Sequence, residues 1–180
     1  MNKSAKEERT GTAVAAAEKR VILSMGGKGG VGKTSVMTGL AEWFVENEIP
    51  VTLLDLDTEN KARGSLAHFF GEQSPKVNIH TPAGLDAFVD RLADGAPVIL
   101  ADMEQAQQFR KVFEPAVIHM DYRLPDLENA SRNHGVTLGQ IAGRTTNAPE
   151  LQKASYVMRA QSYRRRMFAE FDRVKELLLP

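Results

Sequence analysis

The residues whose types and spacing most clearly indicate chemistry lie between positions 27 and 35. They read Gly-Lys-Gly-Gly-Val-Gly-Lys-Thr-Ser, which fits the phosphate-binding loop pattern. Glycines let a loop turn tightly and direct its backbone N–H groups at phosphates. We expect Lys33 to reach the β and γ phosphates of ATP and the Thr34 hydroxyl to bind Mg²⁺. The predicted cofactor-binding residues are Gly27, Lys28, Gly29, Gly30, Val31, Gly32, Lys33, Thr34 and Ser35.

Three aspartates close two apolar runs and are candidates for the rest of the site. Asp55 and Asp57 close the run 51–57, and Asp102 closes the run 97–102. We expect Asp55 to order the Mg²⁺ shell, Asp57 to orient or activate the attacking water, and Asp102 to hold Mg²⁺ through water. The predicted metal residues are therefore Thr34, Asp55 and Asp102. The alternative is that these acidic residues simply end strands.

The elements that must position these residues follow from the hydrophobic pattern. A strand at 21–25 leads into the loop, a helix spans 34–47, and a strand at 51–57 completes a βαβ unit. A third core strand covers 97–102. Continuously apolar strands suit a sheet that is buried on both faces. The pattern predicts an α/β fold with a mainly parallel sheet and helices on both faces. Further expected elements are helices at 64–70, 85–93 and 109–114, an edge strand at 76–80 and a strand at 116–120.

A second lysine in the loop, Lys28, indicates which class of phosphate-binding protein the sequence resembles. The loop Lys-Gly-Gly-Val-Gly-Lys-Thr resembles the deviant Walker A motif of the ParA/MinD (CobQ/CobB/MinD/ParA) family of P-loop ATPases, and the Asp-x-Asp after the first helix resembles its switch I. The resemblance implies an ATP-bound homodimer in which Lys28 reaches the partner's phosphates. Lys28, Lys33 and Asp57 would then be catalytic. It further implies a role in plasmid or DNA partition, positioning or conjugative transfer, with an activating partner protein.

The chain departs from this family in two places. Thr58-Glu59-Asn60 follows the Asp-x-Asp where relatives often have Pro and Gln, and no glycine follows Asp102 up to Gln108. The second half of the sheet is short, which suggests that an internal segment is missing. Two alternatives to the ATPase switch therefore stay open. The first alternative is a non-catalytic, truncated nucleotide- or DNA-binding module, and the second is a metabolic synthetase of the same superfamily.

The C-terminal region is predicted to be helical, over 124–134, 137–144 and a long stretch from 149 to 179. From Glu150 onward it holds seven basic and four acidic residues, a net charge of +3. The candidate DNA contacts are Arg159, Arg164, Arg165 and Arg166. A solvated helix face is the slightly favoured alternative. An amphipathic membrane-targeting end at 171–179 is disfavoured, because the segment is short and carries charges of both signs.

Composition limits the remaining possibilities. The 180 residues have no formal net charge and no cysteine, which excludes disulfides and cysteine-bound zinc. No apolar run approaches a membrane span and no signal-peptide pattern precedes the first strand, so the expected location is cytoplasmic. We expect residues 1–19 to form a flexible arm, 20–148 a nucleotide-binding domain, and 149–180 a helix that belongs to the same domain. The four histidines lack metal-ligand spacing.

Overall fold

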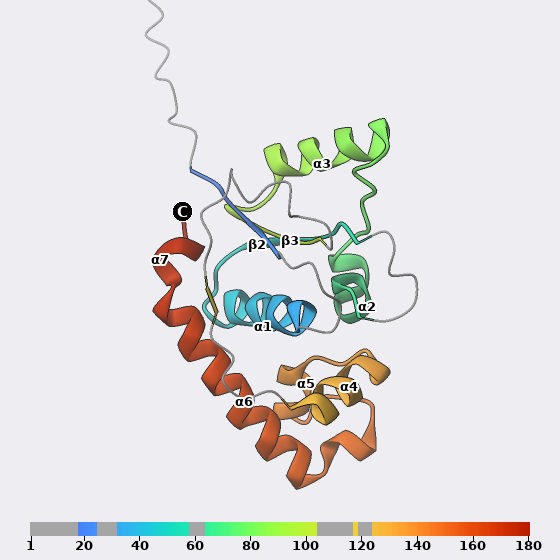
Figure 1. Cartoon of the computed structure of the whole chain (residues 1–180), viewed down its shortest axis with the longest axis vertical. Helices are drawn as coiled ribbons and strands as arrows, with labels where there is room; N and C mark the ends of the chain where they lie inside the picture. Colours follow the sequence, from blue (N-terminus) through green and yellow to red (C-terminus); the bar gives the residue numbers. More distant parts are fainter. Residues whose placement is uncertain (1–17, 25–31, 58–63, 104–116, 119–123) are drawn as a thin grey trace, which may run out of the picture.

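Three parallel strands form the centre of the chain (Figure 1). The computed structural model describes residues 18–24, 32–57, 64–103, 117–118 and 124–180. Strands β1 (Arg20–Leu23), β3 (Val98–Asp102) and β2 (Val51–Asp55) lie side by side in the order β1-β3-β2. In this register Leu23 pairs with Ala101 and Asp55 with Asp102. The carboxyl ends of all three strands therefore meet at one edge, where ligands bind in open α/β sheets.

The central strand β3 is buried on both faces, as its apolar sequence predicts. All five of its residues are buried. Val98 and Leu100 belong to the larger apolar cluster, and Ile99 and Ala101 belong to the smaller one on the opposite face. The period of two along the strand divides these residues between the faces. Helices must therefore cover both sides of the sheet.

Helices α1 (Lys33–Glu46) and α6 (Ala154–Arg173) share the larger cluster. The side chain of Met167 packs directly on Gly39, where a Cβ atom would lie 2.1 Å from the terminal methyl carbon of Met167. Phe44 and Phe171 are fully buried beside them. The indole N–H of Trp43 donates to Asp172 Oδ1 at 2.9 Å. The C-terminal helix is thus packed into the same core as the helix that follows the phosphate loop.

Helix α3 (Pro82–Asp94) covers the other face (Figure 1). Its Phe88 and Leu92 pack against the smaller cluster, whereas Leu85 and Val89 are about half exposed, at 49% and 53%. The helix begins three residues before the predicted residue 85. Thr81 caps it by accepting the Gly84 N–H at 3.1 Å, and proline is favoured at a first helical position.

The predicted edge strand at 76–80 is wrong. Only Lys76 forms a bridge, with Asp55. The chain then turns at Asn78, whose side-chain oxygen accepts the His80 N–H at 3.1 Å and whose carbonyl accepts the Thr81 N–H at 3.2 Å. Asparagine side chains commonly compete with strand pairing in this way. This turn overrides the β propensity of the apolar residues in the segment 76–80.

The remaining elements are short. They are α2 (Leu66–Phe70), η1 (Gly71–Gln73), α4 (Pro125–His134) and α5 (Leu138–Ala142). The long C-terminal stretch is not one helix but three, namely η3 (Pro149–Gln152), α6 and α7 (Lys175–Leu178), because Lys153 and Val174 leave helical geometry. Of the predicted strand at 116–120, only Val117 and Ile118 are described, and neither lies in a strand. The predicted helix at 109–114 and residues 1–17 of the predicted arm lie outside the described residues.

The structure confirms the predicted fold class. The chain is α/β with a parallel sheet, helices on both faces and a long C-terminal helix. In the described part of the chain, no helix has both the length and the apolar character that a membrane span requires.

Candidate nucleotide-binding site

The Thr34 hydroxyl and the Asp102 carboxylate meet at the carboxyl edge of the sheet. Thr34 lies in the first turn of α1 and Asp102 ends β3, and Thr34 Oγ1 donates to Asp102 Oδ2 at 3.4 Å. Hydroxyl and carboxylate oxygens suit Mg²⁺, which usually takes its other ligands from water and substrate phosphates. Among the described residues, no group of three or more His, Cys, Asp or Glu side chains could hold a metal. The pair therefore fits an ion that is held jointly with a nucleotide.

Ser24 fixes the orientation of Asp102. It directly follows β1, and its hydroxyl donates to Asp102 Oδ1 at 2.6 Å while accepting the Met103 N–H at 3.1 Å. All three groups are buried. The end of β1 is thereby tied to the end of β3. This role could not be predicted from the sequence, because a serine is common after any apolar strand.

The other predicted acidic residues lie close enough to Asp102 to affect its pKa. Burial raises the pKa of Asp102, and the Ser24 hydrogen bond opposes this rise. The nearby Asp55 and Asp57 carboxylates raise the pKa further, and Lys33 lowers it. Burial thus disfavours the charged form of Asp102, and a cation bound beside it would offset this effect.

Asp55 ties together the two ends of the connection over residues 58–63. Its side chain is fully buried; Oδ1 accepts the Asp57 N–H and Oδ2 the Ala67 N–H, both at 3.1 Å. The Lys76 ammonium lies 3.9 Å from Oδ2. These contacts favour a positioning role for the carboxylate. A role of Asp55 in the Mg²⁺ shell stays a prediction.

Asp57 lies just beyond β2 and is 8% exposed. Its carbonyl oxygen accepts from the Lys76 ammonium at 3.4 Å, which helps to hold this part of the chain. Its charge acts on Asp102. Asp57 is therefore placed at the expected edge of the sheet, and its role toward water remains a prediction.

The phosphate-binding motif is described from Gly32 onward. Gly32 has a φ of 88°, which favours glycine, and it precedes Lys33, the first residue of α1. The charge of Lys33 acts on Asp102. Ser35 lies in the first turn, where its carbonyl accepts from the Thr38 hydroxyl at 3.1 Å. The remaining loop residues, Gly27, Lys28, Gly29, Gly30 and Val31, lie outside the described residues.

The candidate DNA contacts on α6 differ in their surroundings. Arg159 donates to both carboxylate oxygens of Asp126, at 2.6 and 2.7 Å, and its hydrogen bond lowers the pKa of that exposed carboxyl. Arg165 and Arg166 are exposed. The four arginines thus do not present one uniform basic surface, because Arg159 and Arg164 pair with carboxylates of this chain.

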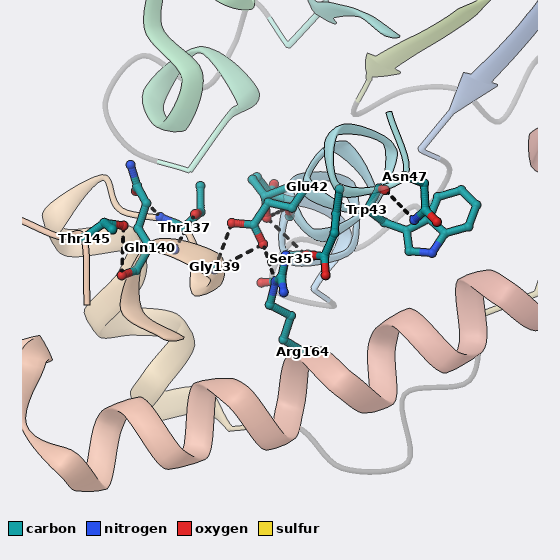
Figure 2. A network of polar contacts seen from close by, with 12 residues as sticks. Ser35, Glu42, Trp43, Asn47, Thr137, Gly139, Gln140, Thr145 and Arg164 are labelled. Atoms are coloured by element: carbon teal, nitrogen blue, oxygen red, sulfur yellow. Dashed lines mark hydrogen bonds and ion pairs between the residues drawn. The ribbon is translucent and has the colours of Figure 1, made fainter. Parts of the chain in front are cut away.

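A largely buried carboxylate, Glu42, whose side chain is 12% exposed, joins α1 to the C-terminal region (Figure 2). The Gly139 N–H donates to Glu42 Oε1 at 2.8 Å, and Arg164 Nε lies 3.5 Å from Oε2. Arg164 also pairs with Glu46, and its guanidinium lies 4.2 Å from the centre of the Phe168 ring. Burial raises the pKa of Glu42, and its hydrogen bonds and the Arg164 charge oppose the rise. Arg164 is therefore a partner of α1 in this structure.

The comparison with protein families agrees with this geometry. Residues 22–168 match the family model described as the CobQ/CobB/MinD/ParA nucleotide binding domain. The match runs from β1 through the phosphate loop, Asp55, Asp57 and Asp102 into α6. No curated protein and no solved structure matches the chain significantly.

Proposed function

The chain belongs to the CobQ/CobB/MinD/ParA nucleotide-binding family, and from this premise we propose that it is a Mg²⁺- and ATP-dependent switch. ATP binding would join two copies of the chain, and hydrolysis would release them. The observation that supports this most is the meeting of Thr34 and Asp102 at 3.4 Å, behind a loop with the phosphate-binding pattern. A hydroxyl at the start of a helix and a strand-ending carboxylate are the groups that hold Mg²⁺ in such sites.

Each residue has a separate task in the proposed cycle. Lys33 binds the β and γ phosphates together with the N-terminal end of α1. Thr34 and Asp102 hold Mg²⁺, which when bound neutralises charge on the phosphates. Asp57 accepts a hydrogen bond from the attacking water and orients it. Asp55 keeps Asp57 in place through the Asp57 N–H at 3.1 Å.

Lys28 is proposed to act across the dimer, on the phosphates that the partner copy holds. The test is sedimentation velocity of the whole chain with Mg-ATP, Mg-ADP or no nucleotide. Of the three conditions, we expect only Mg-ATP to give a dimer of the wild type. We expect Lys28→Ala to be a monomer under all three. A wild-type chain that stays monomeric when it is saturated with Mg-ATP would contradict the dimeric switch.

The proposed cargo is DNA or an assembly bound to it, and an activating protein would accelerate hydrolysis. Arg165 and Arg166 are the candidates for phosphate contacts, because their side chains are exposed to solvent. We expect weak, strongly salt-dependent binding to duplex DNA. A doubly substituted Arg165→Gln, Arg166→Gln chain with unchanged DNA affinity would exclude this surface.

A second candidate function is nucleotide binding without turnover. It is favoured by the absence of glycine in the sequence from Asp102 to Gln108, where a switch would need a flexible backbone. Phosphate release above background that is lost in Asp57→Asn would exclude this alternative. Saturable ATP binding without any release, in the presence and absence of DNA, would favour it over the ATPase switch.

A further inference from the structure

Arg132 extends from the last turn of α4 toward the start of α1. It lines a small cavity together with Thr34, Ser35 and Thr38, which lie on one side of the first turns of α1. Thr34 and Ser35 are residues of the phosphate-binding motif. The side chain of Arg132 thus reaches the nucleotide site from a part of the sequence about one hundred residues away.

A second contact places Arg132 beside the segment that follows Asp57. Gly64 has a φ of 108°, and a Cβ atom there would lie 3.2 Å from both Cδ and Nε of Arg132. Gly64 is the first described residue after the 58–63 connection. The Arg132 side chain therefore passes between the start of α1 and the returning chain.

The backbone of Arg132 is fixed. Its carbonyl oxygen lies 2.7 Å from His68 Nε2 of α2 and accepts the Gly135 N–H at 3.3 Å. Gly135 ends α4 in the left-handed conformation, with a φ of 61°. The side chain thus extends from a stable base, which limits the entropy lost when its guanidinium binds an anion.

The guanidinium of Arg132 has no hydrogen-bond or ion-pair partner among the residues that the structure describes, although the side chain is partly buried. Arg159, Arg164 and Arg173, by contrast, each pair with a carboxylate. The acidic residue that lines the same cavity, Glu128, accepts from the Tyr163 hydroxyl at 2.8 Å. A partly buried guanidinium beside a helix N-terminus has the chemistry of a phosphate ligand.

We propose that Arg132 binds a phosphate group of the nucleotide within the same chain. The inference rests on the proposed nucleotide-binding function and adds to it a ligand that the motif does not contain. It also assigns a task to the divergent second half of the chain, which supplies a cation from α4. Because the contact is charge-assisted and can be bidentate, it should contribute substantially to affinity.

The test is calorimetric titration of the whole chain with Mg-ATP. Arg132→Gln should lower the affinity about tenfold to a hundredfold, and Arg132→Lys should lower it less, because lysine keeps the charge but not the planar fork. Arg91→Gln is the matched control, because Arg91 also lies in the last turn of a helix, on the opposite side of the sheet. It should leave the affinity unchanged. Circular dichroism and thermal unfolding establish that each variant is folded.

Two negative results have different meanings. If Lys33→Ala abolishes binding while folded Arg132→Gln and Arg132→Lys bind as tightly as the wild type, the assignment of Arg132 is wrong and the nucleotide site stands. If the folded wild type binds no Mg-ATP, the proposed function fails, and the assignment of Arg132 fails with it. A loss of affinity in Arg91→Gln equal to that in Arg132→Gln would also overturn the assignment, because it would indicate a general charge effect.

Discussion

The Gly139 N–H donates to both carboxylate oxygens of Glu42, with Oε1 and Oε2 at 2.8 and 3.1 Å from the nitrogen. Glu42 lies on the helix that begins at the phosphate loop, and Gly139 lies in the first turn of α5. Arg164 of α6 approaches the same carboxylate at 3.5 Å. One largely buried acidic group thus connects α1 with two helices of the C-terminal region.

This environment predicts a pH dependence of stability. Burial raises the pKa of Glu42 above 4.5 in the folded chain. The folded state therefore binds this proton more tightly than the unfolded state, and the associated stabilisation is lost as pH rises through the folded-state pKa. The free energy of unfolding of the wild type should fall relative to that of Glu42→Gln between pH 4 and pH 8, by about 1.4 kcal/mol per unit of pKa shift.

Urea unfolding at several pH values measures this difference. Glu46→Gln is the control, since Glu46 also pairs with Arg164 but its side chain is 55% exposed. Glu46→Gln keeps the Glu42 carboxylate, so its free energy of unfolding should retain the pH dependence that Glu42→Gln removes. Parallel pH profiles for the wild type and Glu42→Gln would show that the carboxylate titrates as it does in the unfolded chain.

Ser24→Ala should weaken both the fold and the site. The substitution removes a buried hydroxyl that bonds to Asp102 Oδ1 and Met103 N. It leaves the Met103 N–H and one oxygen of Asp102 with one partner fewer, which costs about 1–3 kcal/mol of unfolding free energy. Mg-ATP affinity should also fall, because Asp102 loses its fixed orientation. Unchanged stability and affinity in this variant would mean that Ser24 does not position Asp102.

Asp57→Asn should separate binding from hydrolysis. The amide keeps the shape of the side chain but removes the negative charge that orients the water, so hydrolysis should fall about a hundredfold or more while Mg-ATP still binds. Phosphate release and calorimetric titration on the same sample measure the two quantities. Equal hydrolysis rates in the variant and the wild type would mean that a group other than Asp57 orients the attacking water.

Phe171→Ala tests whether the C-terminal helix is part of the nucleotide-binding unit. Phe171 is fully buried and its ring lies 6.3 Å from that of Trp43 on α1. Loss of this side chain should lower the free energy of unfolding by about 3–5 kcal/mol. A single cooperative transition at lower denaturant concentration is expected. Two separate transitions in the wild type would instead indicate independent units.

The strands and their carboxyl ends could be predicted because their signals are local. A buried strand is continuously apolar, as at 97–102, and the phosphate-binding pattern contains its own turn residues. Those two features also place Asp102 and Thr34 at the same edge of the sheet. Local signals failed at residues 76–80, where the Asn78 turn overrides the apolar pattern.

The parts of the site that come from distant segments could not be predicted in the same way. Glu42 and Gly139 are 97 positions apart, and the contact of Arg132 with Gly64 depends on how α4 packs against α2. Neither Arg132 nor Glu42 belongs to a motif. The sequence indicated four arginines of the C-terminal region as one basic group, but packing pairs Arg159 and Arg164 with carboxylates.

The most direct test of the central claim is calorimetric titration of the purified chain with Mg-ATP, with Lys33→Ala as the paired sample. We predict saturable binding by the wild type, weaker binding when Mg²⁺ is removed by a chelator, and no measurable binding by folded Lys33→Ala. Tight Mg-ATP binding by Lys33→Ala, or no binding by the folded wild type, would contradict the assignment of the nucleotide site to this loop.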